Sequence, residues 1–337
     1  MNRRSVIIIA AGALLTAAAF CADIALGSVG ISASEVLDTI LGRQTDESIS
    51  RIIMRFRLPK AVTALLAGAA LGASGLQMQT LFRNPLAGPY VLGISSGATL
   101  GVAVFLLGIP MLGPDSQWVR DIGMAGAAWA GAACVFMMIT AVSRRIKDIM
   151  VILILGMMFG SVAGAVVEIL QYFSAESAVK SFVVWTMGSL GGVTAAQTKI
   201  MAPVIITGLA ISLLTVKSLN LLLLGENYAR SMGLDLSRSR TAILVSTTLL
   251  AGTVTAFCGP IGFLGLAVPH IARMILAQAD HRVLMPASML AGSLLMLLCD
   301  IASQLPASGV SIPINTVTAL VGIPVIIAVI VRNRKIF

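Results

Sequence analysis

The sequence predicts an all-α integral membrane protein with about ten transmembrane helices. Of its 337 residues, 58% are hydrophobic and 11% are charged, whereas soluble domains carry about 25% charged residues. Apolar runs long enough to cross a bilayer recur along the whole chain, since a spanning helix needs roughly 20 mostly apolar residues. The alternating segments of about 10 residues that are typical of membrane β-barrels do not occur in the sequence. We therefore treat residues 1–337 as a single transmembrane domain.

Hydropathy places the spans in order along the chain. The apolar run from Val6 to about Ala22 follows Arg3 and Arg4. We interpret it as a retained first helix, because it is long for a signal peptide, lacks a clean cleavage site and precedes many further spans. A mixed polar segment follows, with a short helix predicted at residues 34–41. Nine further spans are predicted at residues 60–81, 92–109, 122–142, 149–172, 196–216, 241–258, 268–278, 283–303 and 312–331.

Basic residues are distributed unequally between the predicted loops. If the N-terminus is cytoplasmic, 15 of the 23 Lys and Arg residues lie on the cytoplasmic side and 8 on the other. Cytoplasmic loops of membrane proteins carry such an excess. We therefore expect both termini in the cytoplasm, on the same side as the polar stretch at residues 217–240. The net charge of +9 follows from this distribution and does not indicate a nucleic-acid partner.

One internal repeat is visible. Leu65-Leu-Ala-Gly68 in the second span is followed by Gly75, and Leu249-Leu-Ala-Gly252 in the seventh span is followed by Gly259, with six residues between in each case. An offset of five spans is odd, so the two copies point in opposite directions across the membrane. This favours an inverted repeat of spans 2–5 and 7–10, a common transporter architecture. Chance similarity of apolar words in membrane helices is the alternative.

The longest polar interruption in the second half of the chain runs from Gly225 to Arg240. Asn220 is expected to cap a short helix, which Gly233 would end in a left-handed conformation. Asp235 or Ser237 is expected to cap the next helix. These features predict a small folded projection on one membrane face, although an ordinary solvated connection fits the residues equally well.

Two breaks interrupt the apolar spans. Asn84-Pro85 and Gly88-Pro89 predict a non-helical turn at membrane depth, which is tolerated only where it is buried in protein or lines a wet cavity. We favour a cavity-lining or gating turn over a tight surface loop. The second break runs from Cys258 to His270, and a helix is predicted to begin at Pro269. His270 is expected to be a structural hydrogen-bonding residue.

The fifth span carries Gly156, Gly160 and Gly164 at four-residue spacing. Such a stripe allows tight helix packing, and it also fits a smooth wall along a translocation path. The four cysteines stand singly, and both histidines are far from any of them, so neither a metal site nor a disulfide is predicted. No G-x-x-x-x-G-K-[ST] motif occurs, so the chain has no P-loop of its own.

Several motifs together resemble the permease subunits of ABC importers for iron-siderophore complexes, haem and cobalamin. They are Arg57-Leu-Pro-Lys60, Asn84-Pro-Leu-Ala87, Leu92-Gly-Ile-Ser95, Trp185-Thr-Met-Gly-Ser-Leu190, Ala229 to Gly233, Gly259-Pro-Ile-Gly-Phe-Leu-Gly-Leu266 with Val268-Pro-His270, and Thr316 to Pro324. The resemblance covers nearly the whole chain.

This resemblance implies a type II ABC importer permease that works as a homodimer in the bacterial inner membrane. It would move a large metal chelate from periplasm to cytoplasm by alternating access, and would have no catalytic residue and no cofactor of its own. Two separate ATP-binding subunits would hydrolyse ATP with Mg, and a periplasmic or lipoprotein binding protein would deliver the substrate. Membrane lipid surrounds such a subunit, and nucleic acid is not an expected partner.

The same resemblance assigns roles to residues. Those expected to couple to the ATPase are Gly225, Glu226, Ala229, Arg230, Met232, Gly233 and Leu234. Those expected to dock the binding protein are Arg57 and Lys60. Those expected to form the gate are Asn84, Pro85, Leu86, Asp148, Ile149 and Met150. The glycine stripe of Gly156, Gly160 and Gly164 is added to them as a candidate wall of the pathway because of its spacing.

Two positions depart from the family pattern. Gln304 stands where many members carry Arg, and Ser311-Ile-Pro313 stands where many have Glu-Leu-Pro. Both bear on the outer docking surface and on the substrate class. An ion-coupled secondary transporter is the alternative function, but it would need carboxylates in the middle of the spans, which this sequence essentially lacks. A membrane scaffold is a third possibility, and it would not need paired helix breaks.

Overall fold

The computed structural model describes residues 3–27, 31–40, 42–43, 46–109, 117–145, 148–304 and 311–332. Every regular element within these residues is helical. The first half contains α1 (Arg3–Ala25), α2 (Ala33–Ile40), α3 (Glu47–Ile52), η1 (Ile53–Arg57), α4 (Leu58–Leu81), η2 (Pro89–Leu92), α5 (Ile94–Ala103), η3 (Val104–Gly108), α6 (Gln117–Arg145), α7 (Ile149–Phe173) and α8 (Glu176–Thr186). The second half contains α9 (Ala195–Leu214), α10 (Val216–Leu223), α11 (Glu226–Ser231), α12 (Leu236–Thr247), η5 (Thr248–Gly252), α13 (Thr253–Cys258), α14 (Leu264–Leu276), α15 (His281–Gln304) and α16 (Ile314–Arg332).

Ten of these segments match the predicted spans. Within the described residues, seven helices are long and apolar enough to cross a membrane. They include two composite helices, Glu47–Leu81 and Leu236–Cys258, each of which contains one π-helical turn. Three shorter apolar helices, Ile94–Gly108, Leu264–Leu276 and Ile314–Val329, complete the set. The chain is therefore a multi-pass membrane protein, as predicted.

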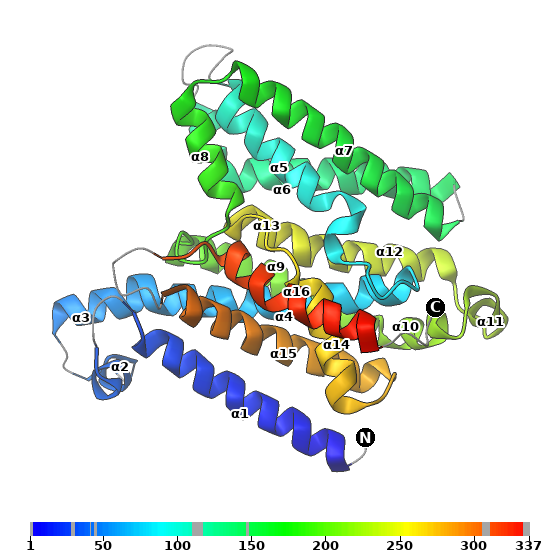
Figure 1. The fold of residues 1–337 in the computed structure, drawn as a ribbon, viewed down its shortest axis with the longest axis horizontal. Coiled ribbons are helices and arrows are strands. Elements are labelled where there is room, and N and C mark those ends of the chain that lie inside the picture. Colours follow the sequence, from blue (N-terminus) through cyan, green and yellow to red (C-terminus); the bar gives the residue numbers. More distant parts are fainter. Residues whose placement is uncertain are drawn as a thin grey trace.

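The bundle has two ends that differ in what they carry (Figure 1). The start of α1, the end of α16 and the short helix α11 lie at one end, which we call the α11 end. Helices α2 and α3 lie at the opposite end, which we call the α3 end. The termini and the polar stretch at residues 217–240 thus share a side, as the distribution of basic residues predicts.

The two repeats exchange their first helices. Helix α4 packs mainly against α15 and also against α14, both from the second half of the chain. Reciprocally, η5 and α13 pack against α5 and α6 from the first half. Within each half the order is the same, because α5 packs on α6 and α7 just as α14 packs on α15 and α16. This is the inverted repeat of spans 2–5 and 7–10.

Small residues make the contact between α4 and α15 possible. A Cβ added to Gly68 would lie 2.2 Å from the backbone oxygen of Gly292, and one added to Gly72 would lie 2.2 Å from that of Ser288. The two backbones therefore touch directly, as small-residue stripes allow in membranes. Helix α4 is almost fully buried along its length, so it forms the core of the bundle.

The structure corrects the predicted start of the eighth span. Helix α14 begins at Leu264, and Pro269 lies inside it. The chain turns before the helix, at Gly259 (φ 76°) and Phe263 (φ 63°). Pro269 has no N–H to bond the carbonyl of Gly265, and this carbonyl instead lies against Gly75, where no Cβ would fit. The contact of α14 with α4 thus allows Pro269 to lie inside the helix, whereas its sequence alone predicted a helix start at this residue.

The polar stretch also differs in detail from its prediction. Helix α10 already begins at Val216, so Asn220 lies inside a helix and does not cap the short helix α11. As predicted, Gly233 is left-handed (φ 83°). Asp235 caps α12 by accepting a hydrogen bond from the backbone N–H of Arg238 at 3.0 Å. The short helix predicted at residues 34–41 is confirmed as α2, whereas α8 was not predicted.

Candidate translocation and coupling site

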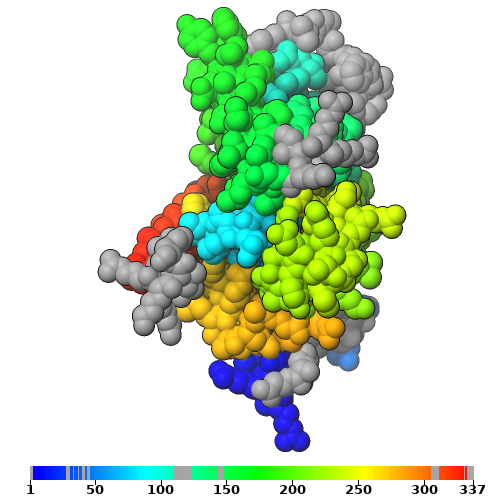
Figure 2. Space-filling model, turned by 90° about the vertical axis from the view of Figure 1, so that its right-hand side faces the viewer, coloured from blue at the N-terminus to red at the C-terminus, as the bar shows by residue number. Residues whose placement is uncertain are grey.

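The projection at the α11 end is a folded unit, which we call the knuckle (residues 224–234). Gly225 (φ 103°) turns the chain away from α10, and Gly233 turns it back toward α12. Three large side chains stand out from its surface, with exposed fractions of 62% for Leu224, 50% for Tyr228 and 59% for Met232. Figure 2 looks onto this end and shows the knuckle in yellow-green. Exposed apolar side chains that lie together mark a contact surface.

Polar contacts tie the knuckle to the helices on either side of it. Glu226 pairs with Arg240 of α12. Ser239 of α12 donates a hydrogen bond to Ser218 of α10 at 3.2 Å. Helix α11 also packs against both α10 and α12. The knuckle is therefore held to both neighbouring helices.

The residues predicted to couple to an ATPase differ in their exposure. Arg230, Met232 and Gly233 are exposed, while Glu226 and Leu234 are partly buried. Ala229 is fully buried, so its methyl group packs inside the knuckle. Tyr228 and Leu224, which sequence reasoning did not select, occupy the exposed surface instead.

The predicted non-helical turn after α4 is confirmed at residues 82–88, which we call the gate turn. Asn84 closes it by accepting a hydrogen bond from the backbone N–H of Leu86 at 2.9 Å. His270 of α14 bonds the backbone oxygen of Pro85 at 2.8 Å, and Nε2 must be the donor because the carbonyl only accepts. His270 is thus a structural hydrogen-bonding residue, as predicted.

The gate turn lies beside the knuckle. A Cβ added to Gly225 would lie 3.8 Å from Nη1 of Arg83 in the gate turn. In Figure 2 the cyan surface of the gate turn borders the yellow-green surface of the knuckle. The knuckle and the gate turn are therefore neighbours at the α11 end.

The breaks of the two repeats touch each other. The hydroxyl of Tyr90, in the first break, donates a hydrogen bond to the backbone oxygen of Ile261, in the second. Gln79, near the end of α4, donates to the backbone oxygen of Leu266 at 3.1 Å. Irregular backbone at membrane depth needs such partners. The two breaks form one irregular region that connects the halves of the chain.

The predicted pathway residues of α7 differ in their surroundings. Asp148 caps the helix by accepting a hydrogen bond from the backbone N–H of Met150 at 2.9 Å. Gly156 packs on η2, where a Cβ would lie 2.9 Å from the backbone, and Gly160 faces Ser96. Gly164 has open space instead. The glycine stripe is therefore a packing surface at one end and an exposed surface at the other.

Most of the remaining surface of α7 lacks a partner in the described chain. Its exposed apolar side chains include Met150, Ile154, Met157, Met158, Val162 and Ile169. Ile149 is half-buried. This helix therefore faces something outside the chain, such as lipid, a second copy or the translocation path.

At the α3 end a buried cluster joins three helices. Lys60 of α4 pairs with Asp300 of α15 at 2.8 Å and lies 4.0 Å from Asp23 of α1. Gln304 donates to both carboxylates at 3.2 Å. Arg57 is also buried, and it donates to backbone oxygens of α1. The docking role predicted for Arg57 and Lys60 stays a prediction, because in this structure both side chains are engaged within the chain.

The two carboxylates of this cluster, Asp23 and Asp300, lie near the ends of their helices, so the expectation that the middle of the spans essentially lacks carboxylates is not contradicted. They come from the first and ninth spans, and they meet at the α3 end rather than at the centre of the bundle. A polar cavity of about 360 Å³ adjoins them, lined in part by Lys60, Asp300 and Gln304. Within the described part of the chain, no three His, Cys, Asp or Glu side chains form a group that could hold a metal ion.

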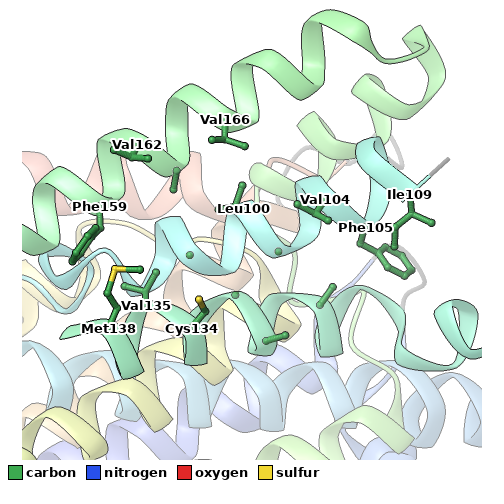
Figure 3. A pocket seen from close by; sticks show the side chains of 16 residues that line it. Leu100, Val104, Phe105, Ile109, Cys134, Val135, Met138, Phe159, Val162 and Val166 are labelled. Atoms are coloured by element: carbon green, nitrogen blue, oxygen red, sulfur yellow. The ribbon is translucent and has the colours of Figure 1, made fainter. Parts of the chain in front are cut away.

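A second cavity, of about 450 Å³, lies between α5, α6 and α7 (Figure 3). Phe159, Val162 and Val166 of α7 point into it, opposite Leu100 of α5 and Val135 of α6. Its walls are almost wholly apolar and offer no charged group to orient a polar solute.

Outside the spans, Asp280 stands between α14 and α15. It accepts hydrogen bonds from the backbone N–H of Arg282 at 2.9 Å and from the amide of Asn220 at 2.7 Å. The Arg282 bond is the main cause of a lowered pKa for Asp280, and the Asn220 bond lowers this pKa further. The carboxylate therefore stays ionised at neutral pH and holds α10 to the start of α15.

An inverted repeat with touching helix breaks defines the class of this protein: it is a membrane-embedded transport permease. The chain belongs to the FecCD transport family, whose model matches residues 14–332. The family resemblance and the type II ABC importer permease fold expected from the sequence are therefore confirmed. No finding favours the ion-coupled alternative.

Individual relatives agree with the family. The chain is 36% identical over 284 residues to the vitamin B12 import system permease protein of Citrobacter koseri, and 37% identical to that of Salmonella typhimurium. Each alignment covers 84% of both chains. The fold is similar to a solved ABC transporter assigned to the metal-chelate type, in an inward-facing conformation. That match has a TM-score of 0.83 and 29% identity, and covers 97% of this chain and 99% of the other.

Proposed function

We propose that this chain is the membrane-spanning subunit of an ATP-driven importer that moves a large metal chelate into the cytoplasm. Its whole length would form one permease domain in the bacterial inner membrane. The observation that carries the proposal is the knuckle, because it presents Leu224, Tyr228 and Met232 to the outside while lying against the gate turn. A surface of this kind fits a separate ATPase subunit that drives the gate.

The mechanism is a two-state switch. ATP binding, with Mg, would close two ATPase subunits beneath a homodimer of this chain. Their motion would displace the knuckles, and the helices around the dimer axis would change which side is open. We assign the exposed face of α7 to the path, together with that of α16, where Leu320 and Ile327 are exposed. The chain itself supplies no covalent chemistry.

This mechanism requires the α11 end to be cytoplasmic. The excess of Lys and Arg on that side supports this orientation. The α3 end would then face the periplasm and receive the binding protein. Lys60 and Arg57 would meet its acidic residues only after giving up contacts that they make within this chain.

Cobalamin is the substrate that we place first. The relatives at 36–37% identity are named for vitamin B12 import. Ferric siderophores and haem are the other candidates, since the matched family and the solved neighbour are described only as transport proteins and a metal-chelate transporter. Gln304 and Ser311, which depart from the family pattern, lie at the polar cavity of the α3 end. They bear on which binding protein docks there.

Reconstitution tests the proposal. The chain would be assembled with the ATPase subunits and the binding protein of its own transport system in proteoliposomes without an ion gradient. We expect ATP-dependent accumulation of cyanocobalamin, with haemin and a ferric hydroxamate siderophore as the competing probes. The wild-type permease without ATPase subunits is the control.

Each outcome has a clear meaning. Uptake of haemin or of the siderophore alone would keep the importer and change its substrate. Uptake that survives ATP depletion but stops when an ion gradient collapses would support the ion-coupled alternative instead. A Met232→Ser chain should bind the ATPase subunits more weakly than the wild type, because it loses part of the exposed surface.

A further inference from the structure

A row of buried polar side chains connects α4 to the helices on both sides of the knuckle. Gln77 is fully buried in α4. Its amide nitrogen donates to Thr215, at the junction of α9 and α10, at 3.2 Å. Its amide oxygen accepts from Thr247, at the end of α12, also at 3.2 Å. One amide therefore holds the chain before the knuckle with its donor and the chain after it with its acceptor.

A second connection lies one turn further along α4, through His281 at the start of α15. Nε2 of His281 lies 2.8 Å from the hydroxyl of Thr80, and Nδ1 lies 2.8 Å from the side-chain oxygen of Asn220 in α10. The Asn220 oxygen only accepts, so Nδ1 carries a proton. The backbone N–H of His281 donates to the same oxygen at 2.8 Å. Asn220 is thus held at a defined position relative to α4.

These side chains form one set, which we call the polar rack: Gln77, Thr80, Thr215, Asn220, Thr247 and His281. On one side, α10 and α12 lead directly into the knuckle, to which the pair of Glu226 and Arg240 adds a further tie. On the other side, the gate turn begins directly after α4. The polar rack therefore spans the distance between the knuckle and the gate turn.

The helices that the polar rack joins resist separation because the bonds between them are buried. Gln77, Thr80, Thr247 and His281 are all buried among apolar helices. A buried polar group that loses its partner suffers the full cost of desolvation, and no water replaces the bond in an apolar interior. Sliding of α12 past α4 would break the bond of Gln77 to Thr247. Sliding of α10 would break the bond of Gln77 to Thr215 and disturb the contact of Asn220 with His281. Joint movement of the three helices keeps all of them.

We propose that the polar rack makes α4, α10 and α12 move as one body, so that a displacement of the knuckle reaches the gate turn. Gln77, Thr80, Asn220 and His281 are positioning residues in this scheme, since none of them touches the substrate. The inference rests on the proposed function, and it names the parts of this chain through which the ATPase acts.

Two near-isosteric substitutions test it. Thr80→Val removes the bond of α4 to His281, and Thr247→Val removes the bond of Gln77 to α12. The double variant therefore leaves α4 with only the bond of Gln77 to Thr215 in place. Ser74→Ala is the matched control, because Ser74 is equally buried in α4 but its hydroxyl bonds only the backbone oxygens of Ala70 and Leu71 in the same helix. All variants would be assembled with their ATPase subunits in proteoliposomes.

The measured quantity is cyanocobalamin taken up per ATP hydrolysed, together with the melting temperature of the complex. We expect the double variant to lose at least about fivefold in this ratio, which corresponds to the lower range of coupling between sites. Ser74→Ala should leave the ratio unchanged. A purely structural role would lower the melting temperature and leave the ratio of the assembled complex intact, and that result would overturn the inference. If the double variant does not assemble, Thr247→Val alone removes the bond of Gln77 to α12, and its ratio should still fall below that of Ser74→Ala.

A second readout does not depend on transport. Spin labels would be attached at Lys217→Cys in α10 and Leu86→Cys in the gate turn, both exposed positions, after replacement of the four native cysteines. When ATP binds to the ATPase subunits, the distance between the labels should stay constant in the complex with the intact rack and should change in the complex with the double variant. A wild-type distance that changes with ATP would refute the single moving body. Absent uptake of every probe with a constant distance would instead count against the proposed function alone.

Discussion

Replacing Gly68 by alanine should force α4 and α15 apart. An added Cβ would lie 2.2 Å from the backbone oxygen of Gly292, whereas ordinary contacts of a Cβ begin at 3.4 Å. The difference, 3.4 less 2.2, requires the backbones to separate by about 1.2 Å. The neighbouring contact between Gly72 and Ser288 is equally close, so the same shift would open it. Overpacking of this kind costs about 1–3 kcal/mol.

The control is Gly164→Ala, because a Cβ at Gly164 meets nothing within 4 Å. Both substitutions gain the same intrinsic helix propensity, about 0.8–1.0 kcal/mol in favour of alanine. The difference between the two variants therefore isolates the steric cost at the interface of α4 and α15. The assay is the fraction of monodisperse protein that remains after heating in detergent, followed by size-exclusion chromatography. Equal midpoints for the two variants would refute the direct backbone contact.

Three further predictions concern the knuckle and the cluster at the α3 end. Ala229→Leu should lower both the melting midpoint and the binding of the ATPase subunits, because Ala229 is fully buried and a larger side chain would overpack the knuckle. Met232→Ser should lower only the binding, which co-purification measures. Gly233→Val should also lower co-purification, since a β-branched residue at φ 83° costs about 1–3 kcal/mol; an unchanged yield of complex would contradict this. Lys60→Met should destabilise the protein by about 3–5 kcal/mol, because it leaves buried carboxylates without their cation. Adding Asp300→Asn should restore part of the melting midpoint. A double variant with the same midpoint as Lys60→Met would show that the pair is unimportant.

Hydropathy was sufficient to locate the spans, because a helix that crosses the apolar core of the membrane must itself be mostly apolar. The start of α14 was predicted wrongly, since a proline normally begins a helix or breaks it. Only contact with Gly75, which is far away in the sequence, explains why Pro269 lies inside the helix. Local rules carry no information about such a contact.

Glycine and proline also located the knuckle and the gate turn, because left-handed and non-helical backbone favours these residues. The same reasoning could not predict which side chains of the knuckle point inward and which point outward. Ala229 points inward and Tyr228 outward because α11 packs on α10 and α12. The orientation of a six-residue helix depends on its neighbours rather than on its own periodicity.

The polar rack and the cluster around Lys60 were the least predictable features. Gln77 meets partners 138 and 170 residues away along the chain, and Thr80 meets one 201 residues away. One signal was present, since Gln77 and Thr80 stand three residues apart in a helix that is largely apolar and rich in small residues. Such a pair lies on one helix face and needs partners there. The identity of those partners depends on the exchange of helices between the repeats.

This exchange also has a consequence for biosynthesis. Helix α4 leaves the ribosome when its main partner, α15, is still about 200 residues from being made, which at about 5–20 residues per second means a delay of roughly 10–40 s. During this time the glycine-lined face of α4 has only lipid, or provisional neighbours, to lie against. Expression of the two halves as separate polypeptides would leave each without its central helix contact until both were inserted in the same membrane. The native packing of α4 is therefore completed only after the second half of the chain has been inserted.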